Sequence, residues 1–191
     1  SVADELNALE PRAGIAPGSV GLHIAIESPR GLFNALAIAE ASPRVVGLMF
    51  GAEDYGWELG LPAIREGEAA ELIHARSSIV MAARAAHVQV VDGVWPNLQD
   101  TDGLMRDIAQ SRRLGFSGKS LFHPSQIDAI NASFSPTPEE IDYCRRVSTA
   151  FDEAMTRGDG SIAFGGQLVD LPIVERARAT LRLAGRLGDD I

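Results

Sequence analysis

Four short apolar runs recur along residues 1–134, and a helix-like pattern follows each of them. The runs are nearly continuous rather than alternating, which is typical of strands buried on both faces of a parallel sheet. This order of elements predicts right-handed βαβ units and an α/β fold. The predicted strands span residues 20–26, 45–50, 87–91 and 118–122, and the predicted helices span residues 32–41, 66–86, 98–115 and 124–134.

The pattern changes after residue 134. The stretch "SPTPEEIDYCRRVSTAFDEAMTRG" has a proline-rich entry and then one long helix. "SIAFGGQLVDLP" predicts a short hairpin around Gly165 and Gly166, and residues 173–187 predict a final helix. We therefore predict two domains, a βα part over residues 1–134 and a C-terminal appendage over residues 135–191.

The chain opens with "SVADELNALE", which lacks an initiator methionine and places Val2, Leu6 and Leu9 on one face of a helix. A start inside a helix suggests that the chain is a fragment.

Composition narrows the classes of partner. A net charge of −9, without a basic run interleaved with aromatic residues, argues against nucleic acid. The sequence predicts no membrane partner, because no apolar run approaches the ~20 residues that span a bilayer and no leader opens the chain. The single cysteine, Cys144, excludes an intrachain disulfide and a cysteine-cluster metal site. A reducing, cytoplasmic location is expected.

Two acidic residues follow neighbouring predicted strands. "IAIESPRG" places Glu27 at the end of the first strand, and "MFGAED" places Asp54 just beyond the second. The carboxyl ends of parallel strands share one edge and adjacent strands lie about 5 Å apart, so both carboxylates can share one cation. Two oxygen ligands with open positions suit Mg²⁺. Helix capping explains the same positions, and spacing alone leaves that alternative open.

Two further polar residues follow the third and fourth strands. "VDGVWPN" brings Asp92 to the same edge, and "FHPSQI" brings His123. A lone histidine before proline is more often a turn or core residue. The placement of Glu27, Asp54, Asp92 and His123 at one edge therefore carries more weight than any single residue. "GFSGKS" resembles the tail of a phosphate-binding loop, but Arg113 stands where that motif has its earlier glycine, and a strand rather than a helix follows. We therefore reject this motif.

Several motifs together carry a family resemblance. "IESPRG", "MFGAED", "VDGV" and "GKSLFHPSQI", in this order, resemble the citrate lyase β-subunit and malyl-CoA lyase family, and "FSPTPEEIDYCRRV" and "GGQLVDLPIVERA" resemble its C-terminal region. The resemblance implies a (β/α)8 TIM barrel and an enzyme that uses Mg²⁺ to cleave or form carbon–carbon bonds beside a CoA thioester. It also implies a homo-oligomer, either a trimer or a hexamer.

The resemblance also implies residue roles. Glu27 and Asp54 correspond to the metal ligands, and backbone N–H groups around Ala52 and Glu53 would hold the substrate carboxylate. Asp92 and His123 are expected to contact substrate. Asp170, in "QLVDLP", would act as the catalytic acid from a neighbouring subunit. A cap on the last helix explains Asp170 equally well, since Pro172 lies near its first turn.

One departure from the family lies before "VGLHIAIES", where the family has further strands, an arginine near the substrate carbonyl and an acidic "LED" segment. A full barrel takes about 250 residues. We therefore expect this chain to supply the C-terminal half of a barrel plus the appendage, through truncation rather than association of half-barrels.

The expected reaction splits a 3-hydroxyacyl-CoA, such as malyl-, citramalyl- or citryl-CoA, into acetyl-CoA and a 2-oxo acid, or runs in reverse. One alternative is a Mg²⁺-dependent aldolase that acts on 2-oxo acids without CoA, and the "VDLP" segment favours the CoA branch. Another is a non-catalytic subunit that binds CoA or an acyl carrier.

Overall fold

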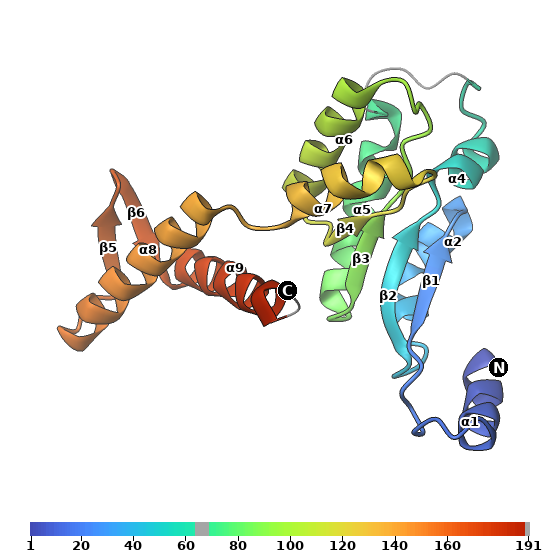
Figure 1. The fold of residues 1–191 in the computed structure, drawn as a ribbon, viewed down its shortest axis with the longest axis horizontal. Helices are drawn as coiled ribbons and strands as arrows, with labels where there is room; N and C mark the ends of the chain where they lie inside the picture. Colours follow the sequence, from blue (N-terminus) through green and yellow to red (C-terminus); the bar gives the residue numbers. More distant parts are fainter. Residues whose placement is uncertain (64–68, 190–191) are drawn as a thin grey trace. The chain divides into compact units, whose positions relative to one another are not determined.

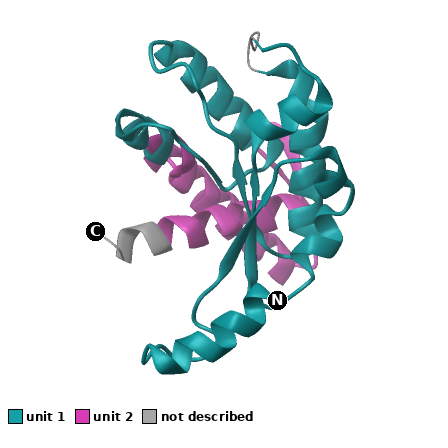
Figure 2. Cartoon of the chain, turned by 90° about the vertical axis from the view of Figure 1, so that its right-hand side faces the viewer, with its two compact units in different colours: residues 1–131 teal, residues 132–191 magenta. Residues whose placement is uncertain are grey.

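The computed structural model describes residues 1–63 and 69–189, so the first three residues of the predicted helix 66–86 lie outside the described part. The chain divides into two compact units, residues 1–131 and 132–191 (Figures 1 and 2). No helix among the described residues is long and apolar enough to cross a membrane.

Unit 1 is built on a parallel sheet of four strands in the order β1-β2-β3-β4 (Figure 1). The strands are β1 (Leu22–Ile26), β2 (Val45–Phe50), β3 (Gln89–Asp92) and β4 (Gly118–Lys119). The register pairs Ile26 with Phe50 and Asp92 with Lys119, so all four carboxyl ends lie at one edge. The predicted parallel α/β sheet is confirmed, and within the described residues β1 and β4 form its two outer edges.

Helices connect and cover these strands. The predicted helix over residues 32–41 is instead two short helices that meet at Asn34. The third strand starts two residues later than predicted, because His87 has a left-handed backbone with φ of 57° directly after a helix. The helical elements of unit 1 are α1 (Val2–Arg12), α2 (Pro29–Phe33), α3 (Ala35–Ala39), α4 (Ala52–Leu59), η1 (Ala70–Leu72), α5 (Ile73–Ala85), α6 (Thr101–Leu114) and η2 (Pro124–Gln126), and α7 (Ile127–Phe134) begins in unit 1 and ends in unit 2.

The core of unit 1 lies between one face of the sheet and the helices. Leu48 and Val90 pair across β2 and β3, and both are completely buried, as is Ile79 on α5. The alternate residues of β1, His23 and Ala25, are exposed. Successive side chains of a strand point to opposite faces, so β1 has one covered face and one open face.

A buried ion pair ties α1 to the start of β2. Glu10 is 2% exposed and accepts hydrogen bonds from Arg44 Nη1 (2.8 Å) and Nη2 (2.6 Å) and from the backbone N–H groups of Gly18 and Val20. Chiefly through the Arg44 hydrogen bonds, these contacts lower the pKa of Glu10 to about 2. The predicted apolar face of α1 is not its buried face, since Val2 and Leu9 are exposed.

Unit 2 contains α8 (Pro138–Thr156), the antiparallel strands β5 (Ser161–Phe164) and β6 (Gln167–Asp170), and α9 (Leu171–Asp189). The predicted hairpin is confirmed. Gly165 and Gly166 form its turn with φ of 58° and 80°, values that favour glycine. Val147, Phe151 and Val169 form the centre of a separate small core.

Candidate functional site

Glu27 and the start of α4 lie together at the carboxyl edge of the sheet. The Gly51 N–H donates to the Ile26 carbonyl (3.0 Å), which extends the contact between β1 and β2 by one residue. The Glu27 side chain then lies against Gly51, because a Cβ added there would be 2.6 Å from Glu27 Oε1. Asp54 lies three residues further along, in the first turn of α4. The two predicted metal ligands therefore come from adjacent βα units at one edge.

Helix capping does not explain these two acids. Ser28 caps α2, since its Oγ accepts from the Gly31 N–H (3.0 Å), and the N-cap of α4 is Gly51, without a side-chain hydrogen bond. Asp54 still gains from the helix dipole in the first turn of α4. Both carboxylates are exposed, and neither has a hydrogen bond or ion pair in the described part of the chain.

This donor set fits a hard, oxygen-binding cation. No group of three or more His, Cys, Asp or Glu residues among the described residues could hold a metal. A site at this edge would consist of the Glu27 and Asp54 carboxylates, with the remaining positions taken by water or substrate oxygens. Mg²⁺ is bound in this way, through one or two carboxylates plus substrate oxygens.

The N-terminus of α4 adds hydrogen-bond donors to the same edge. The first intrahelical bond runs from the Tyr55 N–H to the Gly51 carbonyl (3.0 Å). The N–H groups of Ala52 and Asp54, in the turn before that bond, have no acceptor within the helix. Such groups, with the positive end of the helix dipole, favour an anion. A substrate carboxylate held by the backbone of Ala52 and Glu53 remains a prediction.

Asp92 lies at the carboxyl end of β3, as predicted, but it is only 1% exposed. Arg76 donates to both of its oxygens, with Nε to Oδ1 at 3.2 Å, and Ser111 and Lys119 contact Oδ2. Burial raises the pKa of Asp92, but Lys119, Arg76 and Ser111 outweigh it and lower the pKa below its usual range. These partners account for the burial of Asp92 without a substrate.

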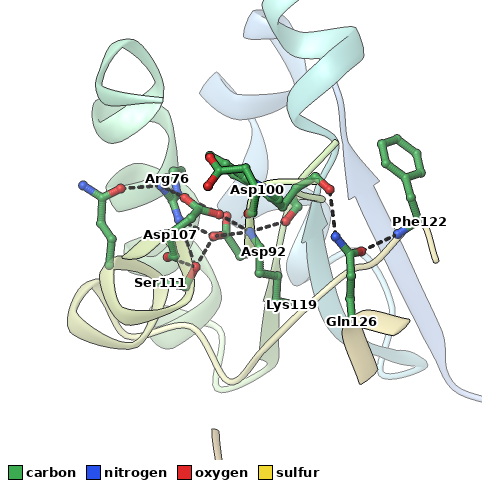
Figure 3. A network of polar contacts seen from close by, with 11 residues as sticks. Arg76, Asp92, Asp100, Asp107, Ser111, Lys119, Phe122 and Gln126 are labelled. Atoms are coloured by element: carbon green, nitrogen blue, oxygen red, sulfur yellow. Dashed lines mark hydrogen bonds and ion pairs between the residues drawn. The ribbon is translucent and has the colours of Figure 1, made fainter. Parts of the chain in front are cut away.

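The contacts of Asp92 belong to a larger buried network (Figure 3). Arg76 Nη1 lies 3.0 Å from Asp107 Oδ1, and Lys119 Nζ contacts Asp107 Oδ2 and donates to the Gly93 carbonyl (2.6 Å). Two cations and two carboxylates from α5, β3, α6 and β4 are thus neutralised together. Sequence reasoning missed Arg76, Asp107, Ser111 and Lys119. The available signal was that charges at the buried ends of apolar strands need partners.

His123 is exposed and caps η2, where its Nδ1 accepts from the Ser125 N–H (3.2 Å). The structure therefore gives it the turn role considered as the alternative. Gln126 fixes this segment, since its Nε2 donates to the Trp95 carbonyl (3.1 Å) and its Oε1 accepts from the Phe122 N–H (3.2 Å) (Figure 3). A contact between His123 and substrate remains a prediction.

Asp170 is the last residue of β6 and directly precedes α9 in unit 2. Its side chain is exposed, and no hydrogen bond or ion pair engages it among the described residues of that unit. The cap alternative therefore has no hydrogen bond to support it.

Comparison with known proteins places these features in a family. Residues 2–124 match the model of the HpcH/HpaI aldolase/citrate lyase family. The chain belongs to this family. The motifs used above fall largely inside the matched range, so the sequence resemblance is confirmed.

Two curated relatives extend the match beyond the family model. The chain is 41% identical over 183 residues to the citrate lyase subunit beta of Escherichia coli (strain K12), covering 96% of this chain and 60% of that protein. It is 33% identical over 167 residues to the mitochondrial citramalyl-CoA lyase of Rattus norvegicus, covering 83% of this chain and 49% of that protein. The chain thus spans about half to three fifths of the length of these relatives.

A solved structure shares the fold of this family member. Protein CitE from Mycobacterium tuberculosis, in complex with magnesium, acetoacetate and coenzyme A, superposes with a TM-score of 0.75 at 33% identity. The match covers 96% of this chain and 65% of that one.

Proposed function

We propose that this chain is part of a Mg²⁺-dependent carbon–carbon lyase that splits a 3-hydroxyacyl-CoA into acetyl-CoA and a 2-oxo acid, or joins them. Membership of the HpcH/HpaI aldolase/citrate lyase family supports the reaction class. The magnesium and coenzyme A bound in CitE support the cation and the thioester. The observation that carries the proposal is the pair of unengaged carboxylates, Glu27 and Asp54, at one edge of the sheet.

Glu27 and Asp54 would hold the Mg²⁺. When bound there, the cation supplies Lewis-acid polarisation of a substrate oxygen. The role of this chain is to keep the two carboxylates at the edge without competing protein partners. Gly51 serves that role directly, because any larger residue would displace the Glu27 side chain.

The N–H groups of Ala52 and Glu53 would bind the carboxylate of the 2-oxo acid. Their backbone donors lie at the start of the helix that carries Asp54, so one rigid element presents both the anion site and a metal ligand. A preorganised arrangement of this kind holds reacting groups in place without reordering during the reaction.

Asp170 would donate the proton that converts the enolate of acetyl-CoA into its methyl group. When the carbon–carbon bond breaks, its electron pair passes to the thioester fragment, and a carboxylic acid then protonates that carbon. We propose that Asp170 reaches the site from a neighbouring subunit of a trimer or hexamer. Its exposed position at the end of a hairpin with a Gly165–Gly166 turn supports such an approach.

The four described strands would form the later half of an eight-stranded barrel. The open edges at β1 and β4 support this arrangement, because a closed barrel would pair both of them.

Calorimetric titration with Mg²⁺ tests the proposal. Glu27→Ala and Asp54→Ala should each abolish binding, since one carboxylate is a poor site for a strongly hydrated ion. Glu58→Ala is the matched control, an exposed acid on the same helix but far from its first turn. Equal Mg²⁺ affinity in the parent chain and all three variants would contradict a metal site at this edge.

The aldolase alternative is tested by comparing CoA thioesters with free acids as substrates. The family model is named for aldolases as well as citrate lyases, and the same carboxylate pair would serve both chemistries. Turnover of free acids alone would favour the aldolase. Metal binding without any turnover would favour a non-catalytic subunit.

A further inference from the structure

The buried network reaches the start of α4, because Lys119 donates to the Gly93 carbonyl and Gly93 packs against Ala52. Lys119, at the end of β4, has a side chain only 1% exposed, and its ammonium contacts Asp92, Asp107 and the carbonyl of Gly93. An ammonium has three N–H donors, so these three acceptors account for all of them. The bond to Gly93 is short, at 2.6 Å, and it is the only one of the three that reaches a loop backbone.

Gly93 transmits this contact to α4. It follows β3, and a Cβ added at Gly93 would lie 2.8 Å from Ala52 Cβ and 3.1 Å from the Phe50 carbonyl oxygen. The backbone of Gly93 therefore packs so closely against the first residue of α4 that an added Cβ would overlap Ala52. Movement of Gly93 would move the start of α4, because buried side chains and backbone leave little free volume.

We infer that Lys119 is a positioning residue that fixes the N-terminus of α4, and with it Asp54 and the Ala52 N–H, by holding the Gly93 carbonyl. The inference rests on the proposed function for its consequence, but the mechanical link from Lys119 to Ala52 does not depend on a metal. Partners that orient ligands from behind a metal site typically change its affinity 10- to 100-fold.

Arg44 provides a matched control, because it lies at the amino-terminal ends of the strands, opposite the carboxyl edge that carries the proposed site. Arg44 precedes β2, is buried, pairs with Glu10, and donates to the carbonyl of Val20 (3.0 Å). It therefore combines a buried cation, a carboxylate and a backbone carbonyl, as Lys119 does, but away from α4. Arg44→Met and Lys119→Met both remove a buried charge, and only Lys119→Met should alter the start of α4.

The double variant Lys119→Met/Asp107→Asn keeps the remaining network balanced, because it retains one cation, Arg76, and one carboxylate, Asp92. It removes the bond to Gly93 without leaving an unpaired buried charge, which would be strongly destabilising. This variant keeps the test decisive if Lys119→Met fails to fold.

Amide NMR spectra of the 191-residue chain without added metal provide the first measurement. The resonances of Ala52, Glu53 and Asp54 should shift in Lys119→Met and in the double variant, and should stay in place in Arg44→Met. Unchanged resonances in the double variant, or equal shifts in Arg44→Met, would overturn the inference.

Mg²⁺ titration provides the second measurement. The double variant should bind Mg²⁺ about 10-fold more weakly than the parent chain, the low end of the effect expected for an orienting partner, while Arg44→Met should match the parent. Failure of the parent to bind Mg²⁺ would contradict the proposed function, and the NMR comparison would still decide the role of Lys119. Full Mg²⁺ affinity in a double variant with shifted amides would limit Lys119 to the fold and overturn its role at the site.

Discussion

The Glu27 side chain lies across the α-carbon of Gly51, at the point where β2 passes into α4. This contact brings a carboxylate from the end of β1 to the helix that carries Asp54. It also makes Gly51 a sensitive position, because a methyl group there would overlap the Glu27 carboxylate.

Gly51→Ala should therefore weaken Mg²⁺ binding by at least about 10-fold, as expected when a ligand is reoriented. The comparison is Gly118→Ala, whose added methyl group on β4 of the same sheet meets no atom within 4 Å. Isothermal titration of both variants checks the prediction. Equal affinity in the two would mean that Glu27 is not held where the metal binds.

Gly93→Ala should also disturb the proposed Mg²⁺ site, because Gly93 packs against Ala52 at the start of α4. The added methyl group would lie 2.8 Å from Ala52 Cβ and 3.1 Å from a backbone oxygen, and backbone cannot give way as a flexible side chain does. We expect weaker Mg²⁺ binding together with a lower midpoint of urea unfolding. A variant with unchanged affinity would show that the start of α4 tolerates this displacement.

The Glu10–Arg44 pair predicts a specific acid sensitivity. The folded-state pKa of Glu10 is about 2, below the ordinary value of 4.5. Stability from this pair is therefore fully present above pH 4.5 and is lost as the pH falls through about 2. Urea unfolding of the parent and of Glu10→Gln at a series of pH values measures this. The difference in stability should shrink as the pH falls from 4.5 towards 2. A constant difference would contradict the depressed pKa.

In the full-length enzyme, Asp170→Asn should reduce turnover of a CoA thioester about 10²- to 10⁴-fold, the range for a positioned acid–base group, and leave Mg²⁺ affinity unchanged. Asp159→Asn, an exposed acid in the same unit, serves as the control. Mixing Asp170→Asn subunits with Glu27→Ala subunits should restore part of the activity, because intact sites can form between them. A mixture as inactive as its parents would exclude the contribution from a neighbouring subunit.

The strand ends could be predicted from sequence because chain order and periodicity decide them. Glu27 and Asp92 each directly follow or end an apolar run, and parallel pairing brings both to one edge. The start of β3 was harder, because the left-handed backbone of His87 leaves no mark in the apolar pattern.

The buried network could not be predicted because its partners are distant in sequence. Arg76 lies 16 residues from Asp92 and 35 from Ser111, and no local spacing connects them. Similarly, the pattern of α1 indicated that Val2 and Leu9 would form its contact face. The buried residue of α1 is instead Glu10, which accepts hydrogen bonds from Arg44 and two backbone N–H groups. Pairing of a charge across a fold depends on tertiary structure that periodicity does not encode.

The most direct test of the metal site replaces Mg²⁺ with paramagnetic Mn²⁺ and follows the amide resonances of the chain. Mn²⁺ accepts the same oxygen ligands, and its unpaired electrons broaden signals from nearby nuclei. The amide resonances of Glu27 and residues 51–54 should broaden first, those of residues around Glu10 should stay sharp, and Asp54→Ala should remove the effect. Broadening that begins elsewhere, or that persists in Asp54→Ala, would contradict a metal site formed by Glu27 and Asp54.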